Sequence, residues 1–482
     1  MSQPATTPGE GAPRDGRWEM LTLALVAPLV GGLCLVLWHT PFPVSEAVAL
    51  FEDVSRNASP AAFFNPQTSY YRPFFHASLW AFWHHAGTLG TTLALVKLLQ
   101  IVPVLLLAGL LVRQLRPRRL LDAAVATTAV AVLLALPAFR DNVEIPLAYT
   151  TVGMPVALAA WMLMERAHQA WHGAALVVLT VVAVGFKEQG LVLVPLVLAA
   201  WVARAPGVRI ADAGAVGLFG VAYLAFRLLN SGRWPMFEQE VGFGFGVLSS
   251  AEATERFGDF PYPIYAYNGL STVLNVLFSE PTSGVFRTLR GLLAGEGQPL
   301  EVVALVSSGL LTALVVAWAY DAARRAWREG WSPDARAALA LVVVLAGSAA
   351  LSFNYSRDRL GGMAVPFYAL AAYAALRWAA LGVVRYGARR AHPVLLPAAA
   401  IGLLVLAGLW QLRALDTIEF VRGRALGNQR EWMTDLPRRR VEFADRPEYL
   451  GIMERLVEQG TASGAPVPTD FRRFARQWVR GR

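Results

Sequence analysis

The sequence predicts an all-α polytopic membrane protein that crosses the bilayer about ten or eleven times. Two observations on the 482-residue chain lead to this fold class. The chain is 55% hydrophobic and only 16% charged, whereas about a quarter of the residues of a soluble protein are charged. Its apolar residues form long runs separated by short arginine-rich clusters. Because about twenty apolar residues span the hydrocarbon core, we expect a membrane helix for each run.

The apolar runs follow one another along most of the chain. The first follows Arg14 and Arg17 and lacks a small-residue cleavage site, so we interpret it as a retained helix rather than a signal peptide. The fourth and fifth are short, which leaves the helix count open by one or two. The expected helices lie near 18–38, 89–112, 120–138, 150–164, 173–186, 189–203, 211–229, 300–319, 337–353, 362–382 and 394–412.

The distribution of cations predicts the orientation. Cytoplasmic loops of membrane proteins are enriched in arginine and lysine. With the N-terminus inside, the arginine clusters within 113–119, 204–209, 324–336 and 385–390 all fall on the cytoplasmic side. The net charge of +9 is explained by such clusters, so a nucleic-acid partner is not expected. A bacterial inner membrane fits this arrangement best.

This topology divides the chain into three regions. Residues 1–17 are rich in Pro, Gly and Thr and are expected to form a disordered cytoplasmic N-terminus. Residues 18–413 form the membrane domain, with outer loops at 39–88 and 230–299 that we expect to carry short amphipathic helices. Residues 414–482 are polar and are expected to form a small soluble helical tail.

Cationic side chains gather on the predicted outer face, opposite to the side that the positive-inside rule favours. Lys187 and Glu188 lie between two apolar runs with almost no room for a loop. They line a polar cavity or, alternatively, form a tight turn with a neutralised ion pair. A guanidinium can hold phosphate oxygens bidentately, although a single arginine can also snorkel to lipid headgroups. The candidate phosphate ligands are Arg72, Lys187, Arg227, Arg357 and Arg359.

The first outer loop supplies candidate acids. Transfer of a sugar to a hydroxyl needs a carboxylate that accepts the proton of the acceptor. Glu46 lies closest to the first membrane helix, and Glu52 and Asp53 follow it. Glu46 or Asp53 is therefore the candidate base, and the choice between them stays open. The supporting side chains are Glu52, Tyr71, Glu188 and Gln189.

No metal site is predicted. Cys34 is the only cysteine, which excludes a disulfide within the chain and a cysteine-based metal site. His76, His84 and His85 have no carboxylate at ligand spacing in their segment, and with the neighbouring tryptophans they resemble an interfacial aromatic belt.

Four short motifs resemble those of polytopic GT-C glycosyltransferases, particularly the bacterial relatives of TMTC-type O-mannosyltransferases. They are short and widely spaced, but they follow the order of the family over about residues 40–380. Tyr70-Tyr71-Arg72-Pro73 is similar to the Tyr-Arg-Pro motif, and Lys187-Glu188-Gln189-Gly190 matches the Lys-Glu-Gln-Gly motif. Tyr223 and Arg227 resemble the Tyr-x-x-x-Arg helix end, and Arg357-Asp358-Arg359-Leu360 the polar start of a late helix.

The resemblance implies an inverting glycosyltransferase with a polyprenyl-phosphate sugar as co-substrate, no other cofactor and a catalytic acid in the first outer loop. The active site would then lie on the periplasmic face. One departure concerns the base, because the family often carries an Asp-Asp pair where this chain has Ser45-Glu46, with Glu52-Asp53 further on. The tail also lacks the tetratricopeptide repeats of the larger eukaryotic members, so a repeat-guided protein acceptor is not supported. The class of acceptor (glycan, lipid or protein) is left open.

Two other function classes remain alternatives. A transporter or flippase of lipid-linked sugars would carry charges near mid-bilayer and repeat its segments in two halves. Lys97 is the only clear charge within a run, and no repeat relates the halves. A non-catalytic subunit of an envelope-assembly complex would use the soluble tail as its contact.

Overall fold

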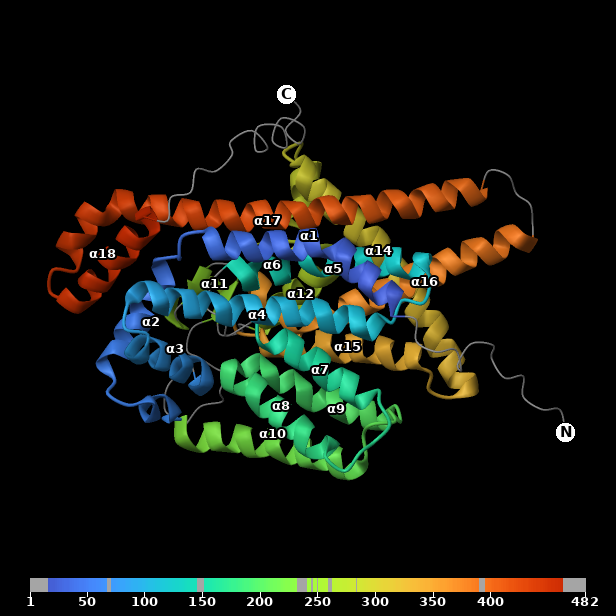
Figure 1. Ribbon diagram of the computed structural model, residues 1–482, viewed down its shortest axis with the longest axis horizontal. Helices are drawn as coiled ribbons and strands as arrows, with labels where there is room; N and C mark the ends of the chain where they lie inside the picture. Colours follow the sequence, from blue (N-terminus) through green and yellow to red (C-terminus); the bar gives the residue numbers. More distant parts are fainter. Residues whose placement is uncertain are drawn as a thin grey trace.

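The computed structural model describes residues 16–66, 71–144, 151–231, 241–243, 246–248, 250–258, 262–282, 284–389 and 395–462. Within this part of the chain the fold is a bundle of helices, with one hairpin of two three-residue strands (Figure 1). The predicted all-α, multi-span architecture is therefore confirmed, and the chain is an integral membrane protein.

Seven helices in the described residues are long and apolar enough to cross a membrane. An eighth span is possible if α5 and α6, which meet at an angle of 58°, are counted together. That bend follows from Pro137, because a residue before proline avoids the helical region and Leu136 is extended. The long helices are α1 (Arg17–His39), α4 (Leu89–Leu115), α10 (Ile210–Ser231), α14 (Pro299–Glu329), α15 (Pro333–Leu351), α16 (Val365–Arg389) and α17 (Leu395–Glu442), and the bent pair is α5 (Leu120–Ala135) and α6 (Pro137–Glu144).

Shorter elements complete the bundle and its ends. Three of them form apolar helices at the predicted segments 150–164, 173–186 and 189–203. The predicted count of ten or eleven spans is reached only if these also cross. The shorter elements are α2 (Ser45–Arg56), η1 (Pro60–Phe64), α3 (Pro73–His85), α7 (Gly153–Met164), α8 (His172–Phe186), η2 (Glu188–Val192), α9 (Leu193–Val202), β1 (Val241–Phe243), β2 (Gly246–Leu248), α11 (Ser250–Phe257), α12 (Tyr262–Phe278), α13 (Arg287–Leu293), η3 (Asp358–Ala364) and α18 (Pro447–Ala462).

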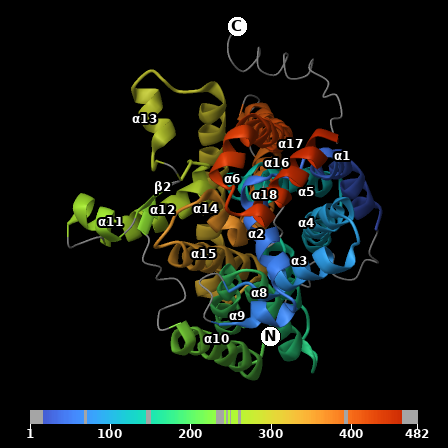
Figure 2. The same ribbon diagram turned by 90° about the vertical axis from the view of Figure 1, so that its left-hand side faces the viewer.

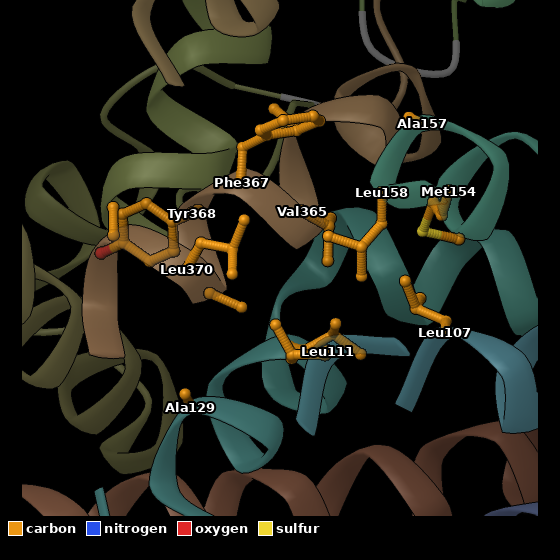
Figure 3. Close-up of a cluster of buried hydrophobic side chains, with 14 of the residues drawn as sticks. Leu107, Leu111, Ala129, Met154, Ala157, Leu158, Val365, Phe367, Tyr368 and Leu370 are labelled. Atoms are coloured by element: carbon orange, nitrogen blue, oxygen red, sulfur yellow. The ribbon is translucent and has the colours of Figure 1, made fainter. Parts of the chain in front are cut away.

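The main hydrophobic core lies where α4, α5, α7 and α16 meet. Figure 3 shows Leu107 and Leu111 of α4 facing Leu158 of α7 and Val365 of α16. Small residues such as Ala129 of α5, which is fully buried, let the helix backbones approach closely.

A second core lies at one end of the bundle. There α2 and α3, which belong to the predicted first outer loop, pack in one cluster with α18, at the left of Figure 1 and toward the viewer in Figure 2. Phe51, Phe75 and Ile452 are among its fully buried members, and Phe186 at the end of α8 packs against it. The start of α3 therefore lies beside the end of α8.

The segment 230–299, which was predicted as a large outer loop, contains a helix of the bundle. Residues 262–278 form α12, which packs against α14 and α15 in the bundle. Its buried side chains include Asn268, Thr272 and Asn275. A search for apolar runs overlooks this helix because most of the side chains that it buries are polar.

The boundary drawn at 413/414 falls inside a helix. α17 continues without a break from Leu395 to Glu442. Its first half is apolar, and its later half carries residues such as Trp432, which packs in the second core. The composition changes along α17 while the backbone stays helical. Residues 1–15 and 463–482 lie outside the described part of the chain.

Candidate functional site: a cluster of cations at the first outer loop

Lys187 lies in a tight reversal of the chain between α8 and η2. The Lys187 backbone is extended, and its carbonyl accepts from the Gly190 N–H at 2.9 Å. A Cβ on Gly190 would lie 2.4 Å from the backbone of Ala183 and Val184, so only glycine allows this return against α8. Lys187 and Gln189 are buried, at 6% and 7% exposure. The Lys-Glu-Gln-Gly segment is thus folded into the protein rather than exposed as a surface turn.

Charged side chains from three other segments surround Lys187. The cations of Arg72 and Arg359 and the carboxylates of Glu188 and Asp141 all act electrostatically on its ammonium. Glu188 also forms an ion pair with Arg72, with 3.6 Å between Oε2 and Nε. Three cations of the predicted phosphate set therefore lie close together, and two carboxylates partly balance them.

Arg359 is placed by contacts between η3 and α6. Its backbone N–H donates to Asp141 Oδ2 at 2.9 Å, and its carbonyl accepts from Asn142 Nδ2 at 3.1 Å. A Cβ on Gly362 would lie 2.4 Å from the Asn142 Nδ2, so the close approach of η3 to α6 requires glycine. Gln189 donates to the Leu360 carbonyl at 3.3 Å, which joins η2 to η3.

Arg227 joins the same region from the end of α10. Its side chain is 1% exposed, and NH1 donates to the Pro66 carbonyl at 2.6 Å. The guanidinium carbon lies 5.0 Å from the centre of the Tyr71 ring, a cation–π arrangement. The Tyr223 hydroxyl interacts electrostatically with Arg72, Arg227 and Glu188. We refer to Arg72, Lys187, Arg227 and Arg359 as the cation cluster.

Aromatic packing fixes the start of α3 against the end of α8. The Phe74 ring lies edge-on to Phe186, with 6.4 Å between ring centres. A Cβ on Gly185 would lie 2.3 Å from the Phe74 ring, so this glycine is required for the contact. His76, one turn along α3, is held neutral because burial and then the positive charge of Arg72 lower its pKa to about 4, against a small opposing effect of Glu188.

The first-loop acids differ in their surroundings. Glu52 is 4% exposed, and both Arg56 and Arg446 bind its carboxylate. Asp53 is exposed on α2; burial of part of its side chain raises its pKa, while an Asn57 hydrogen bond and the Arg56 charge oppose this shift. Neither acid has a partner in the cation cluster.

Three further site predictions have different outcomes. Glu46 belongs to α2, but its side chain lies outside the described structure. Arg357 precedes η3, and its guanidinium carbon lies 5.3 Å from the centre of the Tyr355 ring. Tyr70 lies outside the described residues, so of the Tyr-Arg-Pro segment only residues from Tyr71 onward are described.

Sequence reasoning overlooked Asp141. It lies in the polar segment 140–144, which also carries Glu144, and nothing in the local sequence distinguishes it as a site residue. The structure places it on α6, beside Lys187 and bound to the Arg359 N–H. His76 likewise joins the site only through tertiary packing.

Comparison with known proteins gives limited similarity. No family model and no curated protein matches the chain. Two solved structures of ArnT from Cupriavidus metallidurans align over 97% of the chain. The apo structure is 15% identical, with a TM-score of 0.45 over 91% of its own length. The structure bound to undecaprenyl phosphate is 14% identical, with a TM-score of 0.43 over 92% of its length. Sequence identities and TM-scores this low do not assign the chain to a family.

Proposed function

We propose that this chain is a membrane glycosyltransferase of the GT-C type, which moves a sugar from a polyprenyl-phosphate donor to an acceptor hydroxyl at the outer face of the membrane. The observation that carries the proposal is the cation cluster. Its members come from the start of α3, the α8–η2 junction, the end of α10 and η3, segments that are distant in sequence. Lys187 and Arg227 are buried, and burial of a cation is costly unless an anion compensates its charge.

A lipid phosphate is an anion suited to this cluster. A guanidinium can bind phosphate oxygens through two parallel hydrogen bonds, and a lysine ammonium acts as a point charge. The site has two carboxylates, Glu188 and Asp141, near Lys187, against the four members of the cation cluster. We therefore assign the cluster to the donor phosphate, with Arg357 at its margin.

The reaction exchanges one bond for another at the anomeric carbon. A carboxylate accepts the proton of the acceptor hydroxyl, the hydroxyl oxygen bonds to the sugar carbon, and the bond from that carbon to the phosphate oxygen breaks. The departing polyprenyl phosphate gains negative charge in the transition state, which the cation cluster stabilises. In this scheme Glu188 orients Arg72 through their ion pair. The acceptor attacks from the face opposite the phosphate, so the configuration at the anomeric carbon is inverted.

The base is a carboxylate near this cluster. Resemblance to the family favours Glu46 or Asp53 of the first outer loop, and the geometry adds Asp141 because of its position beside Lys187 and Arg359. Asp53 is the least supported of the three because its interactions are with Glu52, Arg56 and Asn57.

The arginine clusters support the orientation that we propose. They lie between apolar runs where the positive-inside rule would place them on the cytoplasmic side. The N-terminus is then cytoplasmic, the membrane is the bacterial inner membrane, and the cation cluster faces the periplasm.

Reconstituted protein tests the proposal directly. Liposomes with the full chain receive a panel of polyprenyl-phosphate sugars and an extract of envelope acceptors, and release of polyprenyl phosphate is measured by mass spectrometry. Release in wild type and its loss in Lys187→Met supports the transferase. Movement of intact lipid-linked sugar without cleavage would favour a flippase, and neither reaction would favour an assembly subunit. Mass spectrometry of envelope glycans with and without the chain identifies the sugar.

A further inference from the structure

A cavity of about 220 Å³ lies away from the cation cluster, between the end of α1, the first turns of α4 and the end of α18. It shares no residue with the candidate site. Its wall combines an ammonium group, a hydroxyl and an amide with apolar side chains. The lining residues are Trp38, Thr40, Pro41, Phe42, Gly90, Leu93, Ala94, Lys97, Gln459 and Gly460.

Lys97 is held in this wall by the end of α1. Its Nζ donates to the Trp38 carbonyl at 2.7 Å and to the Thr40 carbonyl at 2.6 Å. The last carbonyls of a helix have no partner within the helix, so the ammonium satisfies acceptors that would otherwise lack one. An ammonium has three donors, and two hydrogen bonds leave one of them for a ligand.

No carboxylate in the described structure balances the charge of Lys97. Its hydrogen-bond partners are the neutral carbonyls of Trp38 and Thr40. This differs from Lys187, which two carboxylates accompany. A partly buried ammonium without a counter-charge is costly, and an anion in the adjoining cavity would reduce that cost.

The position of the cavity favours a lipid as the source of the anion. Both α1 and α4 are candidate membrane spans. Trp38 is 40% exposed at the end of α1, and Leu98, next to Lys97, is 42% exposed. Tryptophan beside a cation at the end of a span is typical of the membrane–water interface. The wall around Lys97 is therefore accessible to lipid headgroups.

We propose that this cavity is a second anion site, which binds the phosphate of a lipid headgroup through Lys97, with Thr40 and Gln459 as polar contacts for the rest of the headgroup. The phosphate is the recognised chemistry, and free inorganic phosphate could supply it as well. The proposal does not depend on the glycosyltransferase assignment, because the cavity and the cation cluster have no residue in common.

Native mass spectrometry of the purified full chain tests the proposal. The probes are phosphatidylglycerol, phosphatidylcholine as the zwitterionic control, and inorganic phosphate. Wild type is expected to retain phosphatidylglycerol in preference to phosphatidylcholine. Lys97→Met should reduce that preference about tenfold, the usual effect of losing one charge-assisted hydrogen bond.

A second variant separates binding from folding, since Lys97→Met also removes the cap of α1. Gly90→Leu is designed to fill the cavity while Lys97 stays in place. A Cβ at position 90 would lie 3.8 Å from Gln459 Oε1, which is ordinary van der Waals contact. Gly109→Leu, in the same helix with no atom within 4 Å of its Cβ, is the matched control. The proposal requires loss of lipid preference in Gly90→Leu and its retention in Gly109→Leu.

Each outcome decides the question. Retention of phosphatidylglycerol equal to that of phosphatidylcholine in wild type overturns the proposal, and so does a preference that persists in either Lys97→Met or Gly90→Leu. Thermal stabilisation by inorganic phosphate, lost in Lys97→Met and without lipid retention, would keep the anion site and overturn the lipid assignment.

Discussion

The guanidinium of Arg446 binds the carboxylate of Glu52, although the two residues are 394 positions apart. Glu52 is 4% exposed on α2, so its charge needs partners within the protein. Asn428 of α17 adds a second link, because its Oδ1 accepts from the Val44 N–H at the start of α2 at 2.9 Å. The C-terminal helices thus hold the helix that carries Glu46.

Breaking this link should destabilise the first-loop end of the protein. Arg446→Gln leaves Glu52 with Arg56 as its partner, at 2.7 Å. Because the Arg446 side chain is 41% exposed, we expect a loss of about 1 kcal/mol rather than the larger cost of a fully buried pair. A thermal-unfolding cycle of Arg446→Gln, Glu52→Gln and the double variant measures the coupling. Arg438→Gln, an exposed neighbour, is the control, and additive effects in the cycle would contradict the link.

Lys187→Met should separate function from stability. The substitution keeps a long side chain but removes a charge that is 6% exposed. We expect turnover to fall by about two to three orders of magnitude, as for loss of an electrostatic stabiliser, with stability unchanged or higher because a buried charge is gone. Release of polyprenyl phosphate and thermal unfolding are the two readouts. Arg113→Met, at the far end of α4, should change neither; equal losses of activity in both variants would refute a specific role for Lys187.

The three candidate bases should respond differently to amide substitution. Loss of a general base costs about two to four orders of magnitude in rate. We expect Asp53→Asn to retain most activity, because its partners are Glu52, Arg56 and Asn57 rather than the cation cluster. Glu46→Gln and Asp141→Asn should have the larger effects, in kcat more than in KM. A dominant loss in Asp53→Asn would instead identify that residue as the base.

His76 should make stability depend on pH in the acidic range. Burial and the Arg72 charge lower its pKa from 6.5 to about 4. The unfolded chain therefore binds a proton at His76 more readily than the folded protein does. The free energy of unfolding is at its full value above about pH 6.5, and it falls by on the order of 3 kcal/mol as the pH falls toward 4. Unfolding of wild type and His76→Gln between pH 4 and 8 measures the difference. Parallel curves for the two proteins would show that His76 does not contribute.

Gly190→Ala should disrupt the reversal that positions Lys187. Its Cβ would lie 2.4 Å from backbone atoms of α8, which cannot rotate away as a side chain could. We expect destabilisation of about 1–3 kcal/mol or more and a fall in activity. Gly109→Ala, with open space around its Cβ, should be neutral in the same thermal assay. Normal stability and activity in Gly190→Ala would mean that the backbone reversal is not required.

The amino-acid sequence is sufficient to predict the helical membrane architecture, and the four members of the cation cluster are among the five candidate phosphate ligands that it indicates. Each predicted apolar run coincides with a helix, because transfer from water to lipid depends on local composition and length. Lys187, Arg227 and Arg359 were visible as charges at the ends of such runs, where their cost in lipid demands a reason. These are local properties, and a single sequence contains them.

Which distant residues meet depends on the packing of the folded chain. α12 escaped detection because most of its buried side chains are polar and pair with other elements, as when Asn268 donates to the Phe353 carbonyl. Asp141 beside Lys187, and Glu52 bound by Arg446, follow from helix packing and not from any local pattern. A buried charge can be balanced by any partner that the fold brings near it, so its role is fixed only when the chain has folded.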